Sequence, residues 1–480
     1  MLVFLLAGCP SPCVGVGCAE EYPAALAGVL TGLSDLTAPP ASPRETLLTV
    51  EGTDALGTDW GLALSAGVVL IGSADADAVY SFDATTSGTI LLSDVDVPTL
   101  LGEASGDAFG HALAVVGDGL LIGAPRRAAT DFSHQEGAVY WVGGFASGFS
   151  SDDLIRSAAL RVDGTDQGGG LGSLVKGCGD IDQDGMPDWV ATAPLDSSGA
   201  TLGGFVTLAL SSTLPPSSDT MQTTTARAIG AWWTGSSVGE QAGKSVNCDH
   251  DLTQRRAGRV DSGAEDVPDL LIGAPFADAG SSADAYGALY LIDGEQLISG
   301  PLFLQASRIL YGLEDDSWLG WSVDTGDIDG DGYFEIAAGA PGGVAGAGEV
   351  FIWDGREFAE DGMDAPRYRL QGEEAGDAFG ESVRLLDLDG DGFDELVIGA
   401  PRRNPTTDDA PEAFNSGVLY IFAGADRYQG WLPLMSAASA DIILSEEQQY
   451  LRTGQQIESG DFDGDGLPDL GLLHRYDPSK

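Results

Sequence analysis

Acidic residues recur at a fixed spacing within one short stretch of the chain, residues 326–341. Carboxylates stand at Asp327, Asp329, Asp331 and Glu335, and Gly332 lies among them where the chain must turn sharply. Alternating oxygen donors on a tight loop suit a hard cation that takes six to eight oxygen ligands. The spacing therefore predicts a calcium site.

The acidic pattern is repeated elsewhere in the chain. Three further copies hold Asp180, Asp182, Asp184 and Asp188; Asp387, Asp389, Asp391 and Glu395; and Asp461, Asp463, Asp465 and Asp469. An interrupted copy, split by an insertion at residues 252–264, holds Asp249, Asp251, Glu265 and Asp269. We therefore expect four Ca²⁺ sites, with the interrupted copy as a candidate fifth.

Two other structures share features of these loops. An EF-hand also has acidic residues at its first, third and fifth positions, but it needs a glutamate at position twelve and flanking helices. The residues at position twelve are Ala191, Ala338, Ile398 and Leu472. These are residues of a buried strand, so the pattern excludes an EF-hand. A solvated acidic turn without metal is the remaining alternative, although its clustered carboxylates would repel one another.

The acidic loops lie within a longer repeat that predicts the fold. Each unit opens with an aromatic or apolar residue followed by glycine, as at Phe109 and Phe379, and closes with Gly-Ala-Pro or a relic of it. Seven such units follow one another, each with about four short apolar runs. This pattern predicts an all-β fold, a seven-bladed β-propeller with four antiparallel strands per blade. A spare strand at residues 46–50 is expected to complete the last blade and close the ring.

Composition limits the classes of partner. The 480 residues carry a formal net charge of -52, yet 43% are apolar, which is too many for a disordered acidic tail. Nucleic acid is excluded as a partner because its binding requires a basic surface. Calcium in the loops would offset only part of the negative charge.

The N-terminus predicts an address in the cell envelope. Residues 6–9, Leu-Ala-Gly-Cys, resemble the lipobox of bacterial lipoproteins, which are cut before the cysteine and acylated on it. We therefore divide the chain into a signal segment (1–8), a lipidated Cys9 with a Pro- and Gly-rich tether (9–44), and a propeller (45–480). The lipid would be the only contact with a membrane, and the protein would be anchored in the bacterial envelope or secreted. An apolar N-terminus that merely contains a cysteine is the alternative.

The other four cysteines fit an oxidising compartment. Cys178 and Cys248 lie at nearly the same point of neighbouring repeats, so we expect them to form a disulfide. Cys13 and Cys18 would pair within the tether. The alternative is that these residues are buried free thiols.

Together, the aromatic-glycine pair, the acidic loop and Gly-Ala-Pro resemble the FG-GAP repeats of the integrin α-subunit propeller, over residues 45–480. The resemblance implies calcium in the hairpin between the first two strands of some blades. It also implies that positions one, three, five and nine supply side chains and position seven a backbone carbonyl. The carbonyls would be those of Met186, Tyr333, Phe393 and Leu467.

The resemblance places the loops after Gly-Ala-Pro on the face opposite the calcium hairpins, where integrins bind ligands. Two arginine pairs follow Gly-Ala-Pro and could grip an anionic ligand there, or could simply balance acidic neighbours: Arg126 and Arg127, and Arg402 and Arg403. No catalytic constellation is evident, so we expect no enzyme. The leading hypothesis is a monomeric binding or adhesion module for a protein or glycan. The alternatives are a propeller-type hydrolase or lyase, and a passive surface scaffold.

Overall fold

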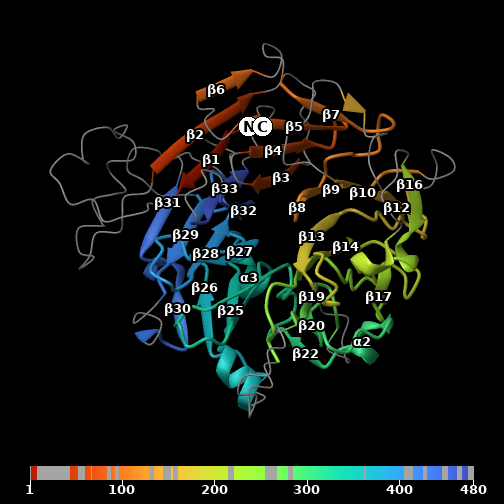
Figure 1. Ribbon diagram of the computed structural model, residues 1–480. Coiled ribbons are helices and arrows are strands. Elements are labelled where there is room, and N and C mark those ends of the chain that lie inside the picture. Colours follow the sequence, from red (N-terminus) through yellow and green to blue (C-terminus); the bar gives the residue numbers. More distant parts are fainter. Residues whose placement is uncertain are drawn as a thin grey trace.

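The fold is a ring of β-sheets around a central axis (Figure 1). The computed structural model describes residues 2–7, 44–51, 60–65, 68–83, 88–91, 97–128, 135–143, 153–154, 160–214, 221–253, 267–278, 285–361, 364–404, 415–424, 430–445, 452–461 and 467–473. All statements about structure below refer to these residues.

Six blades are each built around four successive antiparallel strands. The first three blades contain β3 (Trp60–Ser65), β4 (Val68–Ser73), β5 (Ala78–Asp83) and β7 (Thr99–Leu101); β8 (Leu113–Val116), β9 (Gly119–Ala124), β10 (Ala138–Val142) and β12 (Leu160–Asp163); and β13 (Leu174–Gly179), β14 (Asp188–Ala193), β15 (Phe205–Ala209) and β17 (Gly230–Thr234). The next three contain β18 (Ser245–Asn247), β19 (Leu270–Ala274), β20 (Ala288–Ile292) and β22 (Arg308–Tyr311); β23 (Ser322–Gly326), β24 (Glu335–Ala340), β25 (Glu349–Trp353) and β26 (Tyr368–Gln371); and β27 (Ser382–Leu386), β28 (Glu395–Ala400), β29 (Val418–Phe422) and β31 (Ile442–Ser445).

The prediction of a seven-bladed propeller with four antiparallel strands per blade is wrong, because the described chain forms six blades, several of them with a fifth strand. The remaining sheet joins the two chain ends, in the order β32 (Gln456–Gly460), β33 (Asp469–Leu473), β1 (Leu2–Ala7), β2 (Arg44–Glu51) and β6 (Gly88–Leu91). The expected closing strand, β2, does not reach β33 directly, because β1 pairs with both of them. Cleavage before Cys9 would remove β1; the lipobox stays a prediction, and Cys9, Cys13 and Cys18 lie outside the described residues.

The blades also differ from the prediction at their outer edges. Several sheets gain a fifth strand, which runs parallel to the fourth and comes from the chain segment that leads into the fourth strand of the next blade. Besides β6, these strands are β11 (Asp153–Leu154), β16 (Gln222–Thr225), β21 (Gly300–Pro301) and β30 (Leu434–Ser436). Pairing of this kind satisfies backbone groups that an open edge would leave unpaired.

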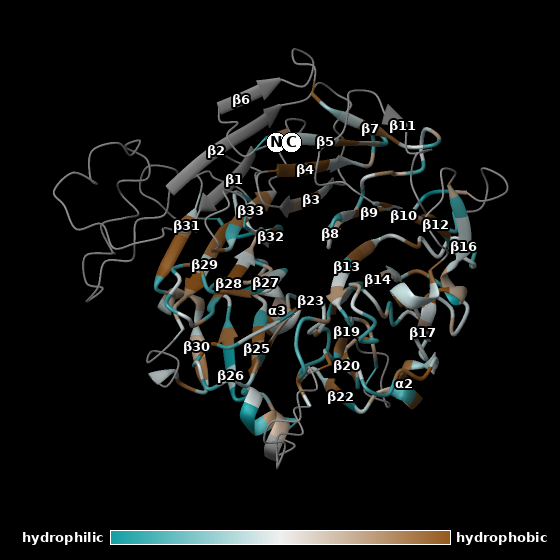
Figure 2. Cartoon of the chain, in the orientation of Figure 1, coloured by the Kyte–Doolittle hydropathy of each residue, from teal (hydrophilic) through white to brown (hydrophobic). Residues whose placement is uncertain are grey.

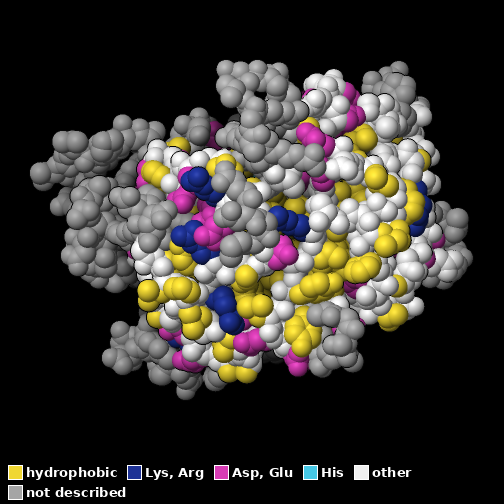
Figure 3. Space-filling view, turned by 90° about the horizontal axis from the view of Figure 1, so that it is seen from below, with side chains coloured by type: hydrophobic (Ala, Val, Ile, Leu, Met, Phe, Trp, Pro, Cys, Tyr) yellow, Lys and Arg dark blue, Asp and Glu magenta, His cyan; other side chains and the backbone are white. Residues whose placement is uncertain are grey.

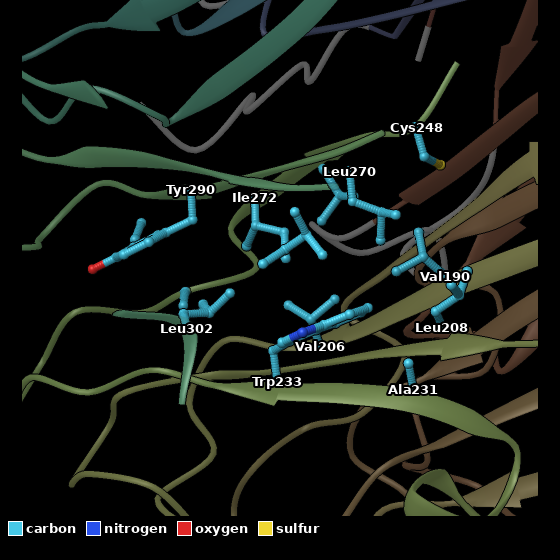
Figure 4. Packing of buried hydrophobic residues seen from close by; sticks show 14 of the residues in the cluster. Val190, Val206, Leu208, Ala231, Trp233, Cys248, Leu270, Ile272, Tyr290 and Leu302 are labelled. Carbon is cyan, nitrogen blue, oxygen red and sulfur yellow. The ribbon is translucent and has the colours of Figure 1, made fainter. Parts of the chain in front are cut away.

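Hydrophobic packing between neighbouring blades forms the core. The second strand of a blade is buried on both faces, so β9, β14, β24 and β28 are buried along their whole length. Figure 2 shows hydrophobic residues concentrated in such strands. In Figure 4, Val206 and Trp233 of one blade lie beside Ile272 and Leu302 of the next, and all belong to one buried cluster.

Glycine in Gly-Ala-Pro permits this close approach of blades. A Cβ atom at Gly339 would lie 1.9 Å from the backbone oxygen of Gly380, the glycine that follows Phe379 in the next blade. Such an overlap cannot be relieved by moving a side chain, since the obstacle is backbone. The glycine of Gly-Ala-Pro and the glycine that follows the aromatic residue therefore form the two sides of one contact between neighbouring blades.

Helical structure is short in the described chain. It consists of α2 (Leu302–Gln305), α3 (Gly343–Gly346), the 3₁₀ turns η4 (Ser211–Thr213), η5 (Ala226–Ala228) and η8 (Ala437–Ser439), and the π turn η6 (Glu357–Asp361). None of these described helices has the length and apolar character that crossing a membrane requires. On the side of the ring seen in Figure 3, acidic and basic side chains alternate with hydrophobic ones.

Candidate metal centres

Three acidic loops bring three carboxylates together, in each case from positions one, three and nine. Within each group, one oxygen of every carboxylate lies within 4.8 Å of one oxygen of the others. The groups are Asp180, Asp182 and Asp188; Asp327, Asp329 and Glu335; and Asp387, Asp389 and Glu395. Each loop joins the first and second strands of its blade, where sequence reasoning placed the metal.

Backbone hydrogen bonds hold the first carboxylate of each loop in place. Asp327 accepts from the backbone N–H of Gly330 at 2.7 Å and of Gly332 at 3.0 Å. Gly332 has a φ of 82°, a left-handed conformation that costs glycine little. Asp387 accepts in the same way from Gly390 and Gly392, and Asp180 accepts from Asp184 and Gly185. These hydrogen bonds set the shape of each loop around its first carboxylate.

The ninth position ties the loop to its blade and is deeply buried. Glu335 is 1% exposed and accepts from the N–H groups of Ile328 at 2.8 Å and Gly355 at 3.1 Å. Burial raises the pKa of Glu335 to about 9 and that of Glu395 to about 8. A buried carboxylate beside two others is costly when ionised, and a bound cation would remove that cost. An all-oxygen donor set of this kind fits calcium.

The fifth-position carboxylates, Asp184, Asp331 and Asp391, are not members of the three groups, and their ligand role stays a prediction. Asp331 accepts from the N–H of Tyr333 at 2.9 Å, and Asp391 accepts from that of Phe393 at 3.0 Å. The ligand role of the carbonyls of Met186, Tyr333 and Phe393 stays a prediction.

The first carboxylate of the interrupted loop forms an ion pair. Asp249 lies 2.8 Å from the ammonium of Lys176 in the preceding blade. Asp269 accepts from the N–H groups of Leu252 and Thr253, both at 2.9 Å, and so keeps the loop-anchoring role of position nine. Glu265 lies outside the described residues, and the described acidic residues of this loop form no group of three.

The last loop is described only in part. Asp461, Leu467 and Asp469 belong to the described chain, and Asp469 is buried. Asp463 and Asp465 lie outside it, so the fourth predicted site stays a prediction.

Neighbouring loops also touch each other. Asp394, next to position nine of its own loop, accepts from the N–H of Asp327 in the preceding blade at 2.7 Å. Burial raises the pKa of Asp394 to about 6. The two loops are thus linked by a hydrogen bond that sequence reasoning did not foresee.

Calcium affinity is expected to fall as the pH is lowered from 9 to 6. With the pKa of Glu335 at about 9 and that of Glu395 at about 8, protons compete with the metal across this range. Competition by one proton weakens binding up to about tenfold per pH unit below the pKa. Calorimetric titration of Ca²⁺ at each pH measures the change, and an affinity independent of pH would contradict the assignment.

The direction in which stability changes with pH follows from the same raised pKa values. Because the folded, metal-free protein holds these protons more tightly than the unfolded chain, its free energy of unfolding decreases as pH rises from about 4.5 toward 9. Saturating calcium should cancel this trend, because it binds the ionised form and its affinity rises with pH over the same range.

The four arginines after Gly-Ala-Pro fall into two classes. The side chain of Arg403 is 8% exposed and pairs with Glu373 at 3.1 Å, Glu374 at 3.0 Å and Asp377 at 3.3 Å. Arg127 pairs in the same way with Glu103 and Asp163. Arg126 and Arg402 have exposed side chains, at 45% and 48%, and lie 3.8 Å from Asp75 and 3.5 Å from Glu381, respectively.

Replacing Arg403 with alanine is expected to destabilise the protein, whereas Arg402→Ala should not. Removal of the buried guanidinium leaves three carboxylates without their ion-pair partner, although the side chain of Glu374 is 59% exposed and will be solvated. We expect a loss of about 2 kcal/mol for Arg403→Ala and below about 0.5 kcal/mol for Arg402→Ala. Chemical denaturation of the two variants side by side measures both; equal effects would argue against a structural role for Arg403.

A cavity of about 930 Å³ lies on the axis of the ring, lined by the first strands of the blades. Two of the three lysines in the chain, Lys176 and Lys244, line it, together with Arg384. Sequence reasoning gave these residues no role. The sequence did contain a signal for Lys176 and Lys244, because lysine is scarce in this chain and both lie in the first strand of a unit or just before it.

Comparison with known proteins covers parts of the chain. Residues 319–353 and 379–422 match the FG-GAP repeat family. Integrin alpha-5 of Xenopus laevis is 31% identical over 159 residues, which is 33% of this chain and 14% of that protein. Phosphatidylinositol-glycan-specific phospholipase D of Bos taurus is 28% identical over 169 residues, which is 33% of this chain and 19% of that protein.

Among solved structures, hydrazine synthase of Kuenenia stuttgartiensis aligns with 79% of this chain and 80% of its own, at a TM-score of 0.40 and 14% identity. That likeness is too weak to carry an argument. The chain spans less than a fifth of the length of the two curated relatives above. One of these relatives is named as an enzyme, so the absence of enzymatic activity stays a prediction. The described fold is a β-propeller that contains FG-GAP repeats at residues 319–353 and 379–422 and is similar to the integrin alpha propeller.

Proposed function

We propose that this chain is a calcium-stabilised binding module that works outside the cytoplasm and recognises a protein or glycan ligand. The observation that carries the proposal is the set of three equivalent carboxylate groups on one kind of hairpin. Three copies at the same structural position point to a shared use, and calcium is the cation that such oxygen donors suit. The likeness to integrin alpha supports a binding role.

We assign the metal ions a role in stabilising the fold and no direct contact with a ligand. The carboxylates of positions one and nine are bonded to the backbone of their own blade, so a cation held there would fasten the hairpin. Ligand contacts are assigned to the opposite face, where the loops differ between blades. Arg126 and Arg402 lie in such loops with exposed side chains.

The Cys178–Cys248 disulfide supports an oxidising compartment, which matches a secreted or envelope location. A monomer anchored through Cys9 is part of the proposal. The acidic charge argues against nucleic acid as a partner.

Protein and glycan arrays, probed with the calcium-loaded protein, test the binding function. A reproducible ligand that is lost in the Arg126→Gln/Arg402→Gln double variant supports the proposal, provided that the variant unfolds at the same temperature as the parent. If no ligand is found and the protein hydrolyses members of a lipid or polysaccharide panel, the binding function is replaced by an enzymatic one.

A further inference from the structure

One end of the axial cavity carries a ring of residues at equivalent positions. Each directly follows the glycine that opens its unit, and all line the cavity. The members of this mouth ring are Leu62, His111, Ser173, Lys244, Trp321, Glu381 and Gln455. Three neighbouring blades contribute Lys244, Trp321 and Glu381 in turn, so opposite charges flank one aromatic ring.

Lys244 is a half-buried cation beside an aromatic ring. Its ammonium lies 4.6 Å from the centre of the Trp321 ring. Burial lowers the pKa of Lys244, and the negative charge of Glu381 opposes that shift. Lys176 is paired with Asp249 at 2.8 Å.

Glu381 offers the opposite charge. Its side chain is 10% exposed, and its Oε2 atom is buried without a hydrogen bond, 3.5 Å from the exposed guanidinium of Arg402. Burial raises the pKa of Glu381, and the positive charges of Arg402, Arg452 and Lys244 oppose that shift. An unsatisfied buried carboxylate oxygen is rare and marks a place where a donor is missing. An ammonium group from a ligand would supply it.

Trp321 belongs to the blade between those that contribute Lys244 and Glu381. Its ring lies 5.9 Å from that of Trp318 and 6.2 Å from that of Phe276, both in loops outside the cavity lining. These neighbours fix the ring that contacts Lys244, so the mouth is shaped in advance rather than formed on binding. The cavity volume is that of a small-molecule site.

We propose that the mouth ring binds a small zwitterion of the α-amino acid type, whose carboxylate pairs with Lys244 and whose ammonium pairs with Glu381. Net charge favours a zwitterion over an anion, because a chain of charge -52 repels anions from a distance. A neutral zwitterion approaches without that penalty and still satisfies both groups. The inference goes beyond the proposed binding function, because it concerns a small molecule in the axial cavity and not a protein or glycan ligand.

Calorimetric titration with L-phenylalanine tests the site in the full-length, calcium-loaded protein. We compare it with 2-phenylethylamine, which lacks the carboxylate, and with 3-phenylpropanoate, which lacks the ammonium. Phenylalanine is expected to bind at least about tenfold more tightly than either analogue, since each loses one charge-assisted contact. No binding of phenylalanine, or equal binding of 3-phenylpropanoate, would overturn the proposal.

Variants locate the binding. Lys244→Gln and Glu381→Gln are each expected to weaken phenylalanine binding about tenfold or more. Lys480→Gln, which removes the same charge at a lysine outside the described residues, is the charge-matched control and should change it less than about twofold. Unchanged binding in Lys244→Gln would place the ligand elsewhere. If a variant does not fold, the analogue series on the parent still decides the matter, and a negative array result leaves it unaffected.

Discussion

Removing calcium is expected to lower the free energy of unfolding by about 4 kcal/mol at three sites filled at tenfold excess over the dissociation constant, about 1.4 kcal/mol per site. The expectation rests on the three converging carboxylate groups and on the burial of Glu335, which is 1% exposed. Without metal, each hairpin must either keep a buried charge or take up a proton. Both alternatives cost stability at neutral pH.

Scanning calorimetry in excess calcium and in excess EGTA measures this effect. Asparagine at position three of every described site is the matched control, as Asp182→Asn, Asp329→Asn and Asp389→Asn together. Asparagine keeps the oxygen that accepts the loop N–H, as Asp329 does from Asp331 at 3.2 Å, but it removes the charge. The triple variant should unfold at the same temperature with and without EGTA. A parent protein that ignores EGTA would refute the metal assignment.

The metal loops could be predicted because their information is local. Positions one, three and nine converge through turns within nine residues, and the spacing of acidic residues and glycine specifies those turns. The repeat likewise predicted the blade strands, because Gly339 and Gly380 keep their contact only if neighbouring units are stacked. The equivalent positions of Cys178 and Cys248 in neighbouring repeats also predicted the disulfide between them, which the structure confirms.

The missed features all depend on contacts between distant segments. The fifth strands are two to four residues long, and β16 reads Gln-Thr-Thr-Thr, with no apolar period to mark it. The place of β1 between β33 and β2 depends on pairing between opposite ends of the chain. Asp249 has the spacing of a ligand, but Lys176, 73 positions earlier in the printed sequence, pairs with it.

Breaking the Cys178–Cys248 disulfide is expected to destabilise the protein by about 4 kcal/mol, from the chain-entropy model for a closed loop of 70 residues. The bond joins the end of β13 to the segment after β18, so it links the inner strands of two neighbouring blades. Both residues are buried, at 1% and 0% exposure, within the cluster shown in Figure 4. The crosslink therefore restrains the unfolded chain and fastens a blade junction.

The test compares the parent with a Cys178→Ala/Cys248→Ala variant, with Cys9, Cys13 and Cys18 replaced by alanine in both so that reductant acts on one bond. Alanine avoids placing an unpaired hydroxyl in the apolar cluster. Reductant should lower the unfolding midpoint of the parent to that of the variant and leave the variant unchanged. Because the Asp180 loop begins two residues after Cys178, chelation and reduction should be coupled at this blade and should add nearly independently at the other two metal groups. A parent that loses no stability once its thiols are shown to be free would mean that packing alone holds this junction.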